Sequence, residues 1–566
     1  MIKTDAVLDF ENLTSNYAKR RAFIIQDIRH EFNSLIEGIL RMHKDSIDWV
    51  LSSLISREPE YGLLFNRCCN LELIKWSIEN NANLKKIILY DRTLYKIVRA
   101  RYASNQKIDI ECRWSIKSSS VYFYFRNLCR SVSIISMILI AKIISKQNKI
   151  KSTSRPLTLV TTHILKDSKQ EYSKEKYIDR YYPDLFNYLD DSIAKNLVFV
   201  PGFPGGLRNY TALFKKLKAS NINFLLKSDI LHISDYFYVF FHAAKPIFRK
   251  VPSVYFKGVD ISKFLRSELI SFSSDYKIID TLLNHRFAFR LSNSGLNVPL
   301  LVDWYENQLP SKGIMLGFNT YMSNTRTIGY HGIIDSAALR LNLHPTTFDR
   351  KYLLTPKEIF VTGSAMVKHM KEFDKNIDIS IGPSFRYNYL WDIEKTSSRS
   401  MIILVSLPIL VRESIIILKL LHSVLKLIDT HHSCKFLVKH HPTHTESNIK
   451  HMSFLNDERV KYVDGAFSEY IASTDLLISG ASTTCIEAMS LGISVAIHGS
   501  ESEIINNSIP DSIPKNLYNI IKSKHELLRL IEELLHHNSV VYNNTYIKEQ
   551  YFRKVDKISV LALFKG

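Results

Sequence analysis

Short apolar runs and longer segments with helical periodicity alternate along most of the chain. In its C-terminal half, Phe436–Val438, Leu476–Ile478 and Val495–Ile497 are short and contain no polar positions. Such runs are typical of strands that are buried on both faces of a parallel sheet. The segments between the runs can each hold a helix. The pattern therefore predicts a strand–helix series that starts at 401–408 and ends with a helix at 525–537.

The N-terminal half of the chain shows the same pattern. Strand-like runs lie at 85–91, 157–163, 196–202, 297–308, 327–335 and 358–365, while 378–385 is interpreted as a crossover. Strands that alternate with helices, in two series, predict an α/β fold with two doubly wound domains. In such domains ligands bind beyond the carboxyl ends of the strands. We therefore expect these ends to meet around one cleft.

This pattern predicts four parts of the chain. Residues 1–84 form an N-terminal helical extension, because apolar positions recur there with helical spacing. Residues 85–375 form a first Rossmann-like domain, which carries an insertion at 104–155. Residues 376–550 form a second Rossmann-like domain, which binds a nucleotide, and 551–566 form a C-terminal helix.

The insertion contains the most apolar segment of the chain, Val132–Ile144. It is too short to span a bilayer, which takes about 20 residues. One interpretation is a helix that lies in the membrane interface. The other is a buried core helix followed by a solvated basic loop. Basic residues on both sides favour membrane contact: Arg126, Arg130, Lys142, Lys146, Lys149 and Lys151.

Composition narrows the class of partner. The 566 residues carry a formal net charge of +20, which favours anionic partners such as phosphorylated substrates or an anionic membrane surface. We find no nucleic-acid-binding motif and predict no nucleic-acid partner. Six cysteines without metal-ligand spacing indicate free, mostly buried thiols in a reducing compartment. The polar N-terminus shows no secretory signal, so we expect a cytoplasmic protein.

Two polar motifs follow predicted strands of the second domain. Lys439-His440-His441-Pro442 lies at a strand end, where a histidine held by the following proline can donate to a phosphate or a nucleotide hydroxyl. The hydroxyl-rich turn Ser482-Thr483-Thr484 lies between a strand and a helix. Free N–H groups at such a helix start favour phosphate. Alone, the histidine is as easily an ordinary loop residue, but the pair predicts a nucleotide site.

Together these motifs resemble the nucleotide-binding half of GT-B glycosyltransferases. The most similar families use cytidine nucleotides: bacterial sialyl- and Kdo-transferases and CDP-glycerol polymerases. The resemblance implies that His441, Ser482 and Thr483 bind the CMP portion of the donor. It also places Glu487 near the ribose or donor sugar, although a carboxylate in the first turn of a helix can simply complement its dipole. The predicted nucleotide-binding residues are Lys439, His441, Pro442, Ser482, Thr483, Thr484 and Glu487.

A second resemblance covers most of the chain. The segments at 49–74, 177–189, 302–308 and 329–332 are similar, in that order, to a family of bacterial surface-carbohydrate biosynthesis proteins from O-antigen and capsule loci. That family usually has Gly-Tyr-Gln-His-Gly in the last segment. Here Gly329-Tyr330-His331-Gly332 lacks the glutamine.

Candidate catalytic residues lie near the predicted strand ends of the first domain. Glu306 is the first candidate base for an acceptor hydroxyl, and a role in orienting its loop is the alternative. Asp179 is the second candidate, although the adjacent Arg180 also suggests a salt bridge. His331 can serve as base or phosphate donor.

Arg386 and Arg412 are candidate clamps for phosphate or acceptor, with a solvated surface arginine as the alternative for each.

We therefore expect a GT-B-like glycosyltransferase that moves a sugar from a nucleotide donor, preferably CMP-activated, to a surface polysaccharide or its lipid-linked precursor. No Asp-x-Asp motif or His/Cys cluster is present, so we predict no metal site, and no cofactor beyond the nucleotide-sugar substrate. The expected location is the inner face of the cell membrane. The alternatives are a CDP-polyol phosphotransferase, a sugar-nucleotide 2-epimerase and an inactive GT-B scaffold.

Overall fold

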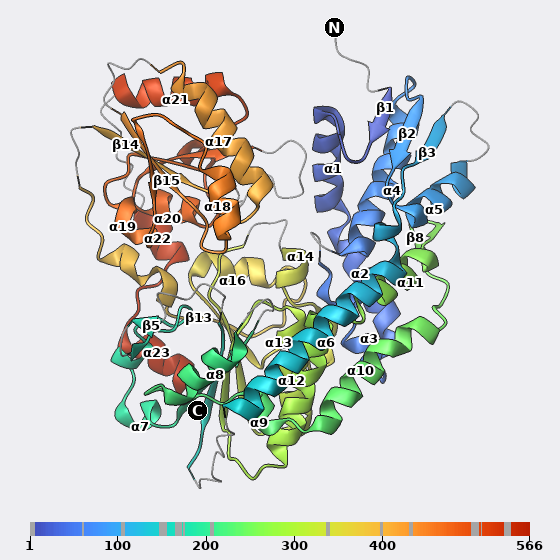
Figure 1. Ribbon diagram of the computed structural model, residues 1–566, viewed down its shortest axis with the longest axis vertical. Helices are drawn as coiled ribbons and strands as arrows, with labels where there is room; N and C mark the ends of the chain where they lie inside the picture. Colours follow the sequence, from blue (N-terminus) through green and yellow to red (C-terminus); the bar gives the residue numbers. More distant parts are fainter. Residues whose placement is uncertain are drawn as a thin grey trace.

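A computed structural model of the chain contains two six-stranded parallel sheets, each with helices packed on its faces (Figure 1). The structure describes residues 6–58, 62–102, 108–145, 155–164, 172–173, 176–203, 209–335, 340–396, 400–428, 434–480, 482–499, 509–510, 512–536 and 545–565. The prediction of an α/β fold with two Rossmann-like domains is confirmed.

The first sheet has the strand order β7-β4-β10-β11-β12-β13, with every neighbouring pair parallel. Alternate residues of its strands enter two different cores. Leu159 and Leu301 join the core on one face, whereas Val160 and Val302 join the core on the other. The strands are β4 (Thr158–His163), β7 (Leu197–Gly202), β10 (Leu300–Trp304), β11 (Arg326–His331), β12 (Glu358–Val361) and β13 (Ile379–Ile381).

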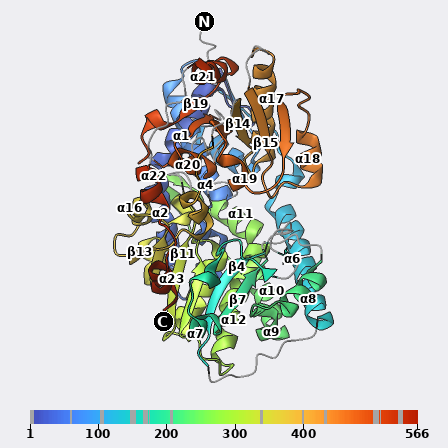
Figure 2. The ribbon, with the colours of Figure 1, turned by 90° about the vertical axis from the view of Figure 1, so that its left-hand side faces the viewer.

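Helices cover both faces of this sheet. Figure 2 shows α6, α8, α9 and α10 together on one side of the strands β4 and β7. The helices are α6 (Ser120–Ile144), α7 (Asp191–Ala194), α8 (Tyr210–Ala219), α9 (Lys227–Ile230), α10 (Ile233–Phe248), α11 (Ser262–Phe272), α12 (Tyr276–Ser292), α13 (Leu309–Tyr321), α14 (Arg340–Leu343), α15 (Thr347–Lys351) and α16 (Ser364–Met370). Two short antiparallel ribbons, β5 (Tyr172–Ser173) with β6 (Lys176–Tyr177) and β8 (Tyr255–Phe256) with β9 (Val259–Asp260), lie between these elements.

The second sheet has the order β16-β15-β14-β17-β18-β19, which is the dinucleotide-fold order 3-2-1-4-5-6. Its strands are β14 (Met401–Ser406), β15 (Cys434–Lys439), β16 (Val460–Val463), β17 (Leu476–Ser479), β18 (Ser494–His498) and β19 (Asn519–Ile521). Its helices are α17 (Val411–Leu425), α18 (Glu446–Met452), α19 (Ser468–Ile471), α20 (Thr484–Ser490) and α21 (Lys524–His536).

The chain returns to the first domain at its C-terminus. The helix α22 (Thr545–Tyr551) packs on α16 and α20, and α23 (Lys557–Phe564) packs on the first sheet. Gly363 permits the close approach of α22, because a Cβ atom there would lie 2.1 Å from the Gln550 carbonyl oxygen. One apolar cluster contains Val361 and Met366 of the first domain and Leu477 and Ile486 of the second. The two domains therefore share a core.

The N-terminal part differs from the prediction. The strand β2 (Lys86–Leu89) does not join the first six-stranded sheet, but pairs with β1 (Val7–Asp9) and β3 (Asp109–Cys112) in a separate parallel sheet. An apolar run shows that a strand is buried without showing which sheet it joins. The expected extension and the start of the expected insertion thus form one small layer, together with α1 (Ser15–Asp27), α2 (Arg29–Arg41), α3 (Ile47–Val50), α4 (Leu63–Asn80) and α5 (Arg92–Tyr102).

A second difference concerns the segment 378–385, which we expected to be a crossover. Ile379–Ile381 instead forms β13, the edge strand beside β12. The strand has three residues, all only half-buried, so its pattern is too short to be recognised from sequence. The crossover into the second domain follows it, through the 3₁₀ helix Phe385–Trp391.

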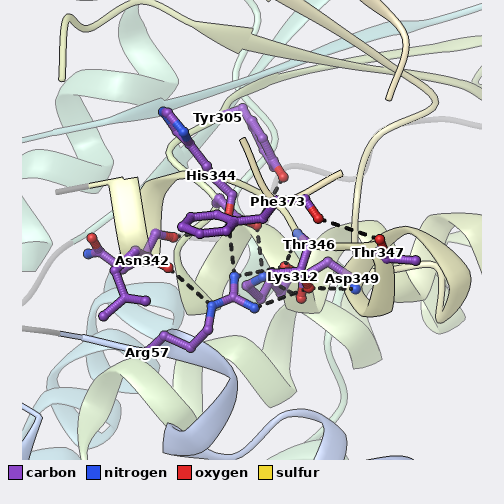
Figure 3. Close-up of polar contacts among 11 residues, drawn as sticks. Arg57, Tyr305, Lys312, Asn342, His344, Thr346, Thr347, Asp349 and Phe373 are labelled. Atoms are coloured by element: carbon purple, nitrogen blue, oxygen red, sulfur yellow. Dashed lines mark hydrogen bonds and ion pairs between the residues drawn. The ribbon is translucent and has the colours of Figure 1, made fainter. Parts of the chain in front are cut away.

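A buried ionic cluster joins the N-terminal layer to the first domain (Figure 3). Arg57 lies in a left-handed conformation with φ +49° and donates to the carbonyl oxygens of Leu341 and His344. It also pairs with Asp349 at 2.8 Å, and Lys312 pairs with the other carboxylate oxygen at the same distance. All three side chains are almost completely inaccessible to solvent. Although burial alone would raise the pKa of Asp349, Arg57 and Lys312 hold it well below its usual value.

The apolar segment of the insertion belongs to α6, a 25-residue helix that the Ser119 side chain caps. Among the described residues, α6 is the one helix long and apolar enough to cross a membrane, by length and composition only. Ile134, Ile135, Ile138 and Ala141 pack into the core. About a third of the most apolar part of α6 is buried, and the exposed side chains include Val132, Ile140, Ile143 and Ile144. One face of α6 thus packs into the core, while another face is apolar and exposed. Lys146, Lys149 and Lys151 lie outside the described residues.

Candidate functional site

The strand orders place a crevice at the carboxyl end of each large sheet. In the first sheet the chain leaves β4 for β7 on one side and later returns to β10 on the other. In the second sheet the same reversal lies between β14 and β17, where the Ser479 hydroxyl donates to the Ser406 carbonyl oxygen. Ligands of open α/β sheets bind at such points. His163 ends β4 and Glu306 follows β10, the two strands beside the first crevice. The turn at Ser482 follows β17, which borders the second.

Glu306 lies just beyond β10, half-buried and held by two neighbours. The Trp304 indole N–H donates to one of its carboxylate oxygens at 2.7 Å, and the Gln308 amide donates to the other at 2.9 Å. Both oxygens keep a lone pair for a further partner. The Glu306 charge also acts on His163 at the end of β4. Burial lowers the pKa of His163, and the nearby carboxylate of Glu306 partly opposes that shift. The carboxylate is therefore held in one orientation by its two donors.

The Asp179 carboxylate is occupied by hydrogen bonds within a turn. It accepts the Thr162 hydroxyl at 2.7 Å and the backbone N–H groups of Tyr181 and Tyr182 at 2.8 and 3.0 Å. Only 5% of the residue is exposed. These contacts suit a residue that positions Arg180 and Tyr181 better than one that accepts a proton from a substrate. Of the two carboxylates, Glu306 is the better placed base.

Arg386 lies at the start of the chain segment that crosses between the domains. Its guanidinium is 5.8 Å from the centre of the Trp304 ring and 6.0 Å from that of Tyr181. Burial lowers its pKa, but Glu306, Glu487 and two tyrosines outweigh that effect. Arg386 is thus a permanent cation whose charge interacts with those of Glu306 in the first domain and Glu487 in the second.

His441 follows β15 in the second domain, and its contacts indicate its tautomer. Nδ1 accepts the Thr443 backbone N–H at 3.2 Å and lies 2.7 Å from the Thr443 hydroxyl. A neutral ring whose Nδ1 accepts carries its proton on Nε2. The adjacent Pro442 is exposed, and Lys439, at the end of the strand, is buried. His441 can therefore donate from Nε2 to an anionic or carbonyl oxygen.

The electrostatics of His441 connect the two domains. Its pKa is lowered to about 4, first by burial and then by His444, Arg180, Lys439 and Arg386. Arg180 and Arg386 precede the second sheet in the chain, whereas His441, His444 and Lys439 belong to the second domain. The two domains therefore place positive charge around one interdomain position, which suits the phosphates of a nucleotide.

The turn before α20 presents three hydroxyl side chains, all half-buried. Ser482 accepts the Thr484 backbone N–H at 3.3 Å and the Thr484 hydroxyl at 2.8 Å, while Thr483 lies beside Tyr387. Because α20 has only seven residues, its dipole is a smaller contribution than its position suggested from sequence. The hydroxyls, together with His441 and the arginines, are therefore the stronger candidates for binding phosphate.

Glu487 points from α20 toward the crossing segment. The Tyr389 hydroxyl donates to its carboxylate, and 6% of the residue is exposed. Burial raises the pKa of Glu487, opposed by Tyr389 and Arg386. Glu487 thus connects the second sheet to the segment that carries Arg386.

His331 does not lie on the cleft surface. It is fully buried, with Nδ1 2.9 Å from the Tyr305 carbonyl oxygen and Nε2 3.4 Å from the Asp335 carboxylate, which His344 also contacts. The expectation that His331 acts as base or phosphate donor is therefore corrected to a structural role. Gly332 has a packing role, because a Cβ atom there would lie 2.3 Å from the Trp304 ring.

Arg412 lies apart from the Arg386 group. It is exposed on the first turn of α17 and lines a polar cavity of about 440 Å³ against the N-terminal layer. Arg21 and Asn70 line the same cavity and are hydrogen-bonded to each other at 3.2 Å. This location is compatible with an acceptor clamp, but not with the same phosphate that Arg386 and His441 face.

Several residues of the site were not among the sequence candidates: Arg180, Tyr181, His163, Tyr387, Tyr389 and His444. Arg180 was recognised only as a salt-bridge partner for Asp179, and His163 only as the last residue of the strand-like run 157–163, whose end was expected at the cleft. The signal that could have found them is position, since each follows a strand of a large sheet or lies on the crossing segment.

The six cysteines are free thiols, and Cys68, Cys69, Cys434 and Cys485 are buried, so the expectation of free, mostly buried thiols is confirmed. Within the described ranges, no group of three or more His, Cys, Asp or Glu side chains is arranged to hold a metal ion.

Comparison with known proteins gives only distant likenesses. A scan against protein-family models finds no match, and a search of curated proteins finds no significant match. Among solved structures, the chain is similar to a putative UDP-N-acetylglucosamine 2-epimerase from Listeria monocytogenes. The sequence identity is 10%, the TM-score is 0.40, and the match covers 71% of this chain and 94% of that one.

Two further solved structures show similar values. MurG from Acinetobacter baumannii matches at 11% identity and TM-score 0.36, covering 72% of this chain and 99% of its own. A variant of the wall teichoic acid polymerase TagF matches at 11% identity and TM-score 0.35, covering 78% and 96%. Since every TM-score is below 0.5, the fold described above rests on the strand orders of the two sheets.

Proposed function

We propose that the protein is a glycosyltransferase of the GT-B type, which moves a sugar from a nucleotide donor to a surface polysaccharide or its lipid-linked precursor. The observation that supports this most is that the charges of Lys439, Arg180 and Arg386 all act on His441, while Arg386 also interacts with the charge of Glu306. It combines phosphate ligands with a candidate base for an acceptor hydroxyl. A CMP-activated donor is favoured by the sequence resemblance around His441 and Ser482.

The roles in this proposal follow from the contacts. His441 donates from Nε2 to the nucleotide, and the Ser482, Thr483 and Thr484 hydroxyls bind its phosphate or ribose. Arg386 and Arg180 stabilise the negative charge that the leaving phosphate gains when its bond to the sugar breaks. If the reaction inverts the anomeric centre, the acceptor hydroxyl bonds to the sugar and its proton passes to Glu306.

Glu487 remains a candidate for the ribose or donor sugar. Its hydrogen bond to Tyr389 also supports a positioning role for Arg386. Arg412 and the cavity that it lines are candidates for the acceptor. Metal-independent catalysis is part of the proposal, because the cations named here already surround the proposed phosphate position.

We also propose that the protein acts at the inner face of the cell membrane, where a lipid-linked acceptor is available. The support is the exposed apolar face of α6, with Val132, Ile140 and Ile143 among its exposed residues and Arg126 and Arg130 exposed near its middle. Such a composition suits the interface of an anionic membrane.

A thermal-shift series with CMP, CDP, UDP, GDP and ADP tests the donor class. The correct nucleotide stabilises the folded state and raises the unfolding temperature, because it binds that state alone. His441→Ala removes the response, while His451→Ala, an exposed histidine on α18 of the same domain, leaves it intact. An equal response of both variants would place the nucleotide elsewhere.

The transfer step has its own test. Glu306→Gln keeps the size and one acceptor oxygen but removes the base, so transfer should fall by about 10²–10⁴ while nucleotide binding stays unchanged. Gln308→Ala removes only one orienting contact and should cost less. Full transfer by Glu306→Gln would rule out Glu306 as the base. Transfer of a polyol phosphate would instead support the phosphotransferase alternative, and an epimerised nucleotide-sugar product would support the epimerase. Nucleotide binding without turnover would support the scaffold.

A further inference from the structure

The helix α10 exposes a continuous row of large apolar side chains. Ile233 is 61% exposed, Phe237 74%, Phe241 64% and Phe248 84%. At 3.6 residues per turn, the four positions fall within about 80° of one another around the helix. Soluble proteins expose single apolar residues commonly, but rarely a row of this size.

The opposite side of α10 is firmly packed, so the row is not the result of a poorly docked helix. Tyr236, Val239, Ala243 and Pro246 are buried, and α10 contacts α3, α11 and α12. A capping box between His232 and Asp235 begins the helix. Folding therefore does not need the exposed row.

Ion pairs fix α10 at both ends and leave a positive surface around the row. Asp235 pairs with Arg286 and Arg290 of α12 at 2.8 Å each, and its side chain is fully buried.

At the other end, Asp48 pairs with Lys245 and Arg249, whose side chains stay 31% and 25% exposed, while that of Asp48 is 5% exposed. Lys250, one residue further on, is exposed as well. Cations thus outnumber carboxylates in these pairs, and only the cations reach solvent.

This combination identifies one kind of occupant. Aromatic and aliphatic side chains beside solvent-exposed Lys and Arg suit the headgroup region of an anionic bilayer. Lys245 lies 4.9 Å from the centre of the Phe241 ring, so a side chain inserted among acyl chains and a cation at headgroup level are adjacent on one helix.

We propose that α10 lies in the interface of an anionic membrane, with Phe237, Phe241 and Phe248 inserted about 5–10 Å below the headgroups. It is a second attachment element, separate from α6. Both helices pack on α11 and α12, and they cross the lower right of Figure 1 on a similar slant. Stable anchoring generally takes two weak signals, which α6 and α10 together supply. The inference deepens the proposed function, because it names an anionic membrane as the partner of α10. It rests on the proposed function only in assuming that the acceptor is held at that membrane.

The test is co-sedimentation of the full-length protein with vesicles of phosphatidylcholine, with and without phosphatidylglycerol. The double variant Phe237→Ser/Phe241→Ser should lower the partition coefficient onto phosphatidylglycerol vesicles about a hundredfold, about tenfold for each ring withdrawn from the acyl region. Lys250→Ala should weaken the preference for phosphatidylglycerol without abolishing binding.

The matched control is Ile558→Ser, because Ile558 is 80% exposed on α23 and stands outside the row. Its binding should equal that of the unmodified protein, and all variants should keep the same unfolding temperature. Binding of the double variant within twofold of the unmodified protein would overturn the inference. So would a dimer, measured by light scattering, that the double variant dissociates while vesicle binding stays intact. CMP calorimetry on the same variants reads the nucleotide site independently, so failure of one proposal is distinguishable from failure of the other.

Discussion

Replacing Asp349 by Asn tests the ionic cluster that joins the N-terminal layer to the first domain. The Asp349 carboxylate pairs with Arg57 and Lys312 at 2.8 Å each and accepts the Thr346 backbone N–H at 2.9 Å. An asparagine oxygen can keep the last contact, but both cations lose their counter-charge. Because the side chains of Arg57, Lys312 and Asp349 are 0–2% exposed, water cannot replace it.

The expected loss follows from that burial. Breaking a buried ion pair by removing one partner costs about 3–5 kcal/mol, because the remaining charge is uncompensated. Lys312 can release its proton, since burial lowers its pKa to about 7, so Arg57 carries most of the loss. Replacing Arg57 by Met in the same chain should therefore recover much of it. The matched control is Glu37→Gln, which breaks an exposed pair with Arg41 and should cost less than about 0.5 kcal/mol.

Urea unfolding gives the free energy, and hydrogen exchange of peptides from 340–351 locates the change. The Asp349→Asn variant should exchange faster there, while peptides of the second sheet keep their protection. A loss below about 1 kcal/mol, or a double variant no more stable than Asp349→Asn, would refute the assignment of a buried, charge-balanced cluster.

Three further predictions concern the site. The pKa of His441 is about 4 in the free protein, and a bound phosphate should raise it, so nucleotide binding should take up a proton and become tighter as the pH falls toward 5. Calorimetry in buffers of different ionisation enthalpy measures the proton uptake. His441→Ala should abolish that uptake. Gly332→Ala places a Cβ against the Trp304 ring, so thermal unfolding should show a loss of about 1–3 kcal/mol, and an unchanged protein would contradict this packing. Tyr389→Phe removes the hydroxyl that donates to the Glu487 carboxylate, and the free energy of unfolding in urea should fall by about 1–3 kcal/mol. Because the pKa of Glu487 is raised in the folded state, this loss of stability should grow as the pH rises above 4.5. A loss that does not depend on pH would contradict the prediction.

The strands of the large sheets were predictable because parallel strands buried on both faces carry unbroken apolar runs. Leu476–Ile478 and Leu300–Val302 are examples, with every residue buried. The strand Lys86–Leu89 has the same kind of run but joins a different sheet. Its partners Val7–Asp9 and Asp109–Cys112 are only three and four residues long, too short for a recognisable pattern. Ile379–Ile381 was missed because an edge strand of three half-buried residues leaves too short a pattern.

The candidate site was predictable where a motif lies at a strand end, as for Glu306 and His441. His331 follows the same rule, yet it is buried, because the strand end of β11 is covered by residues such as Asp335 and His344 that no local pattern connects to it. Arg180 lies in a turn that Asp179 holds, and Tyr389 lies in the 3₁₀ helix Phe385–Trp391, where it contacts Glu487. Neither contact leaves a periodic pattern in the sequence.

The central claim is that one nucleotide is bound by residues of both domains. Calorimetric titration of CMP into the unmodified protein, Arg386→Gln and His441→Ala tests it most directly. Each variant removes one hydrogen bond to a charged group, worth about 1.5–3 kcal/mol, so each should raise the Kd roughly tenfold to a hundredfold. An affinity that His441→Ala lowers but Arg386→Gln leaves unchanged would confine the nucleotide to the second domain and contradict the claim.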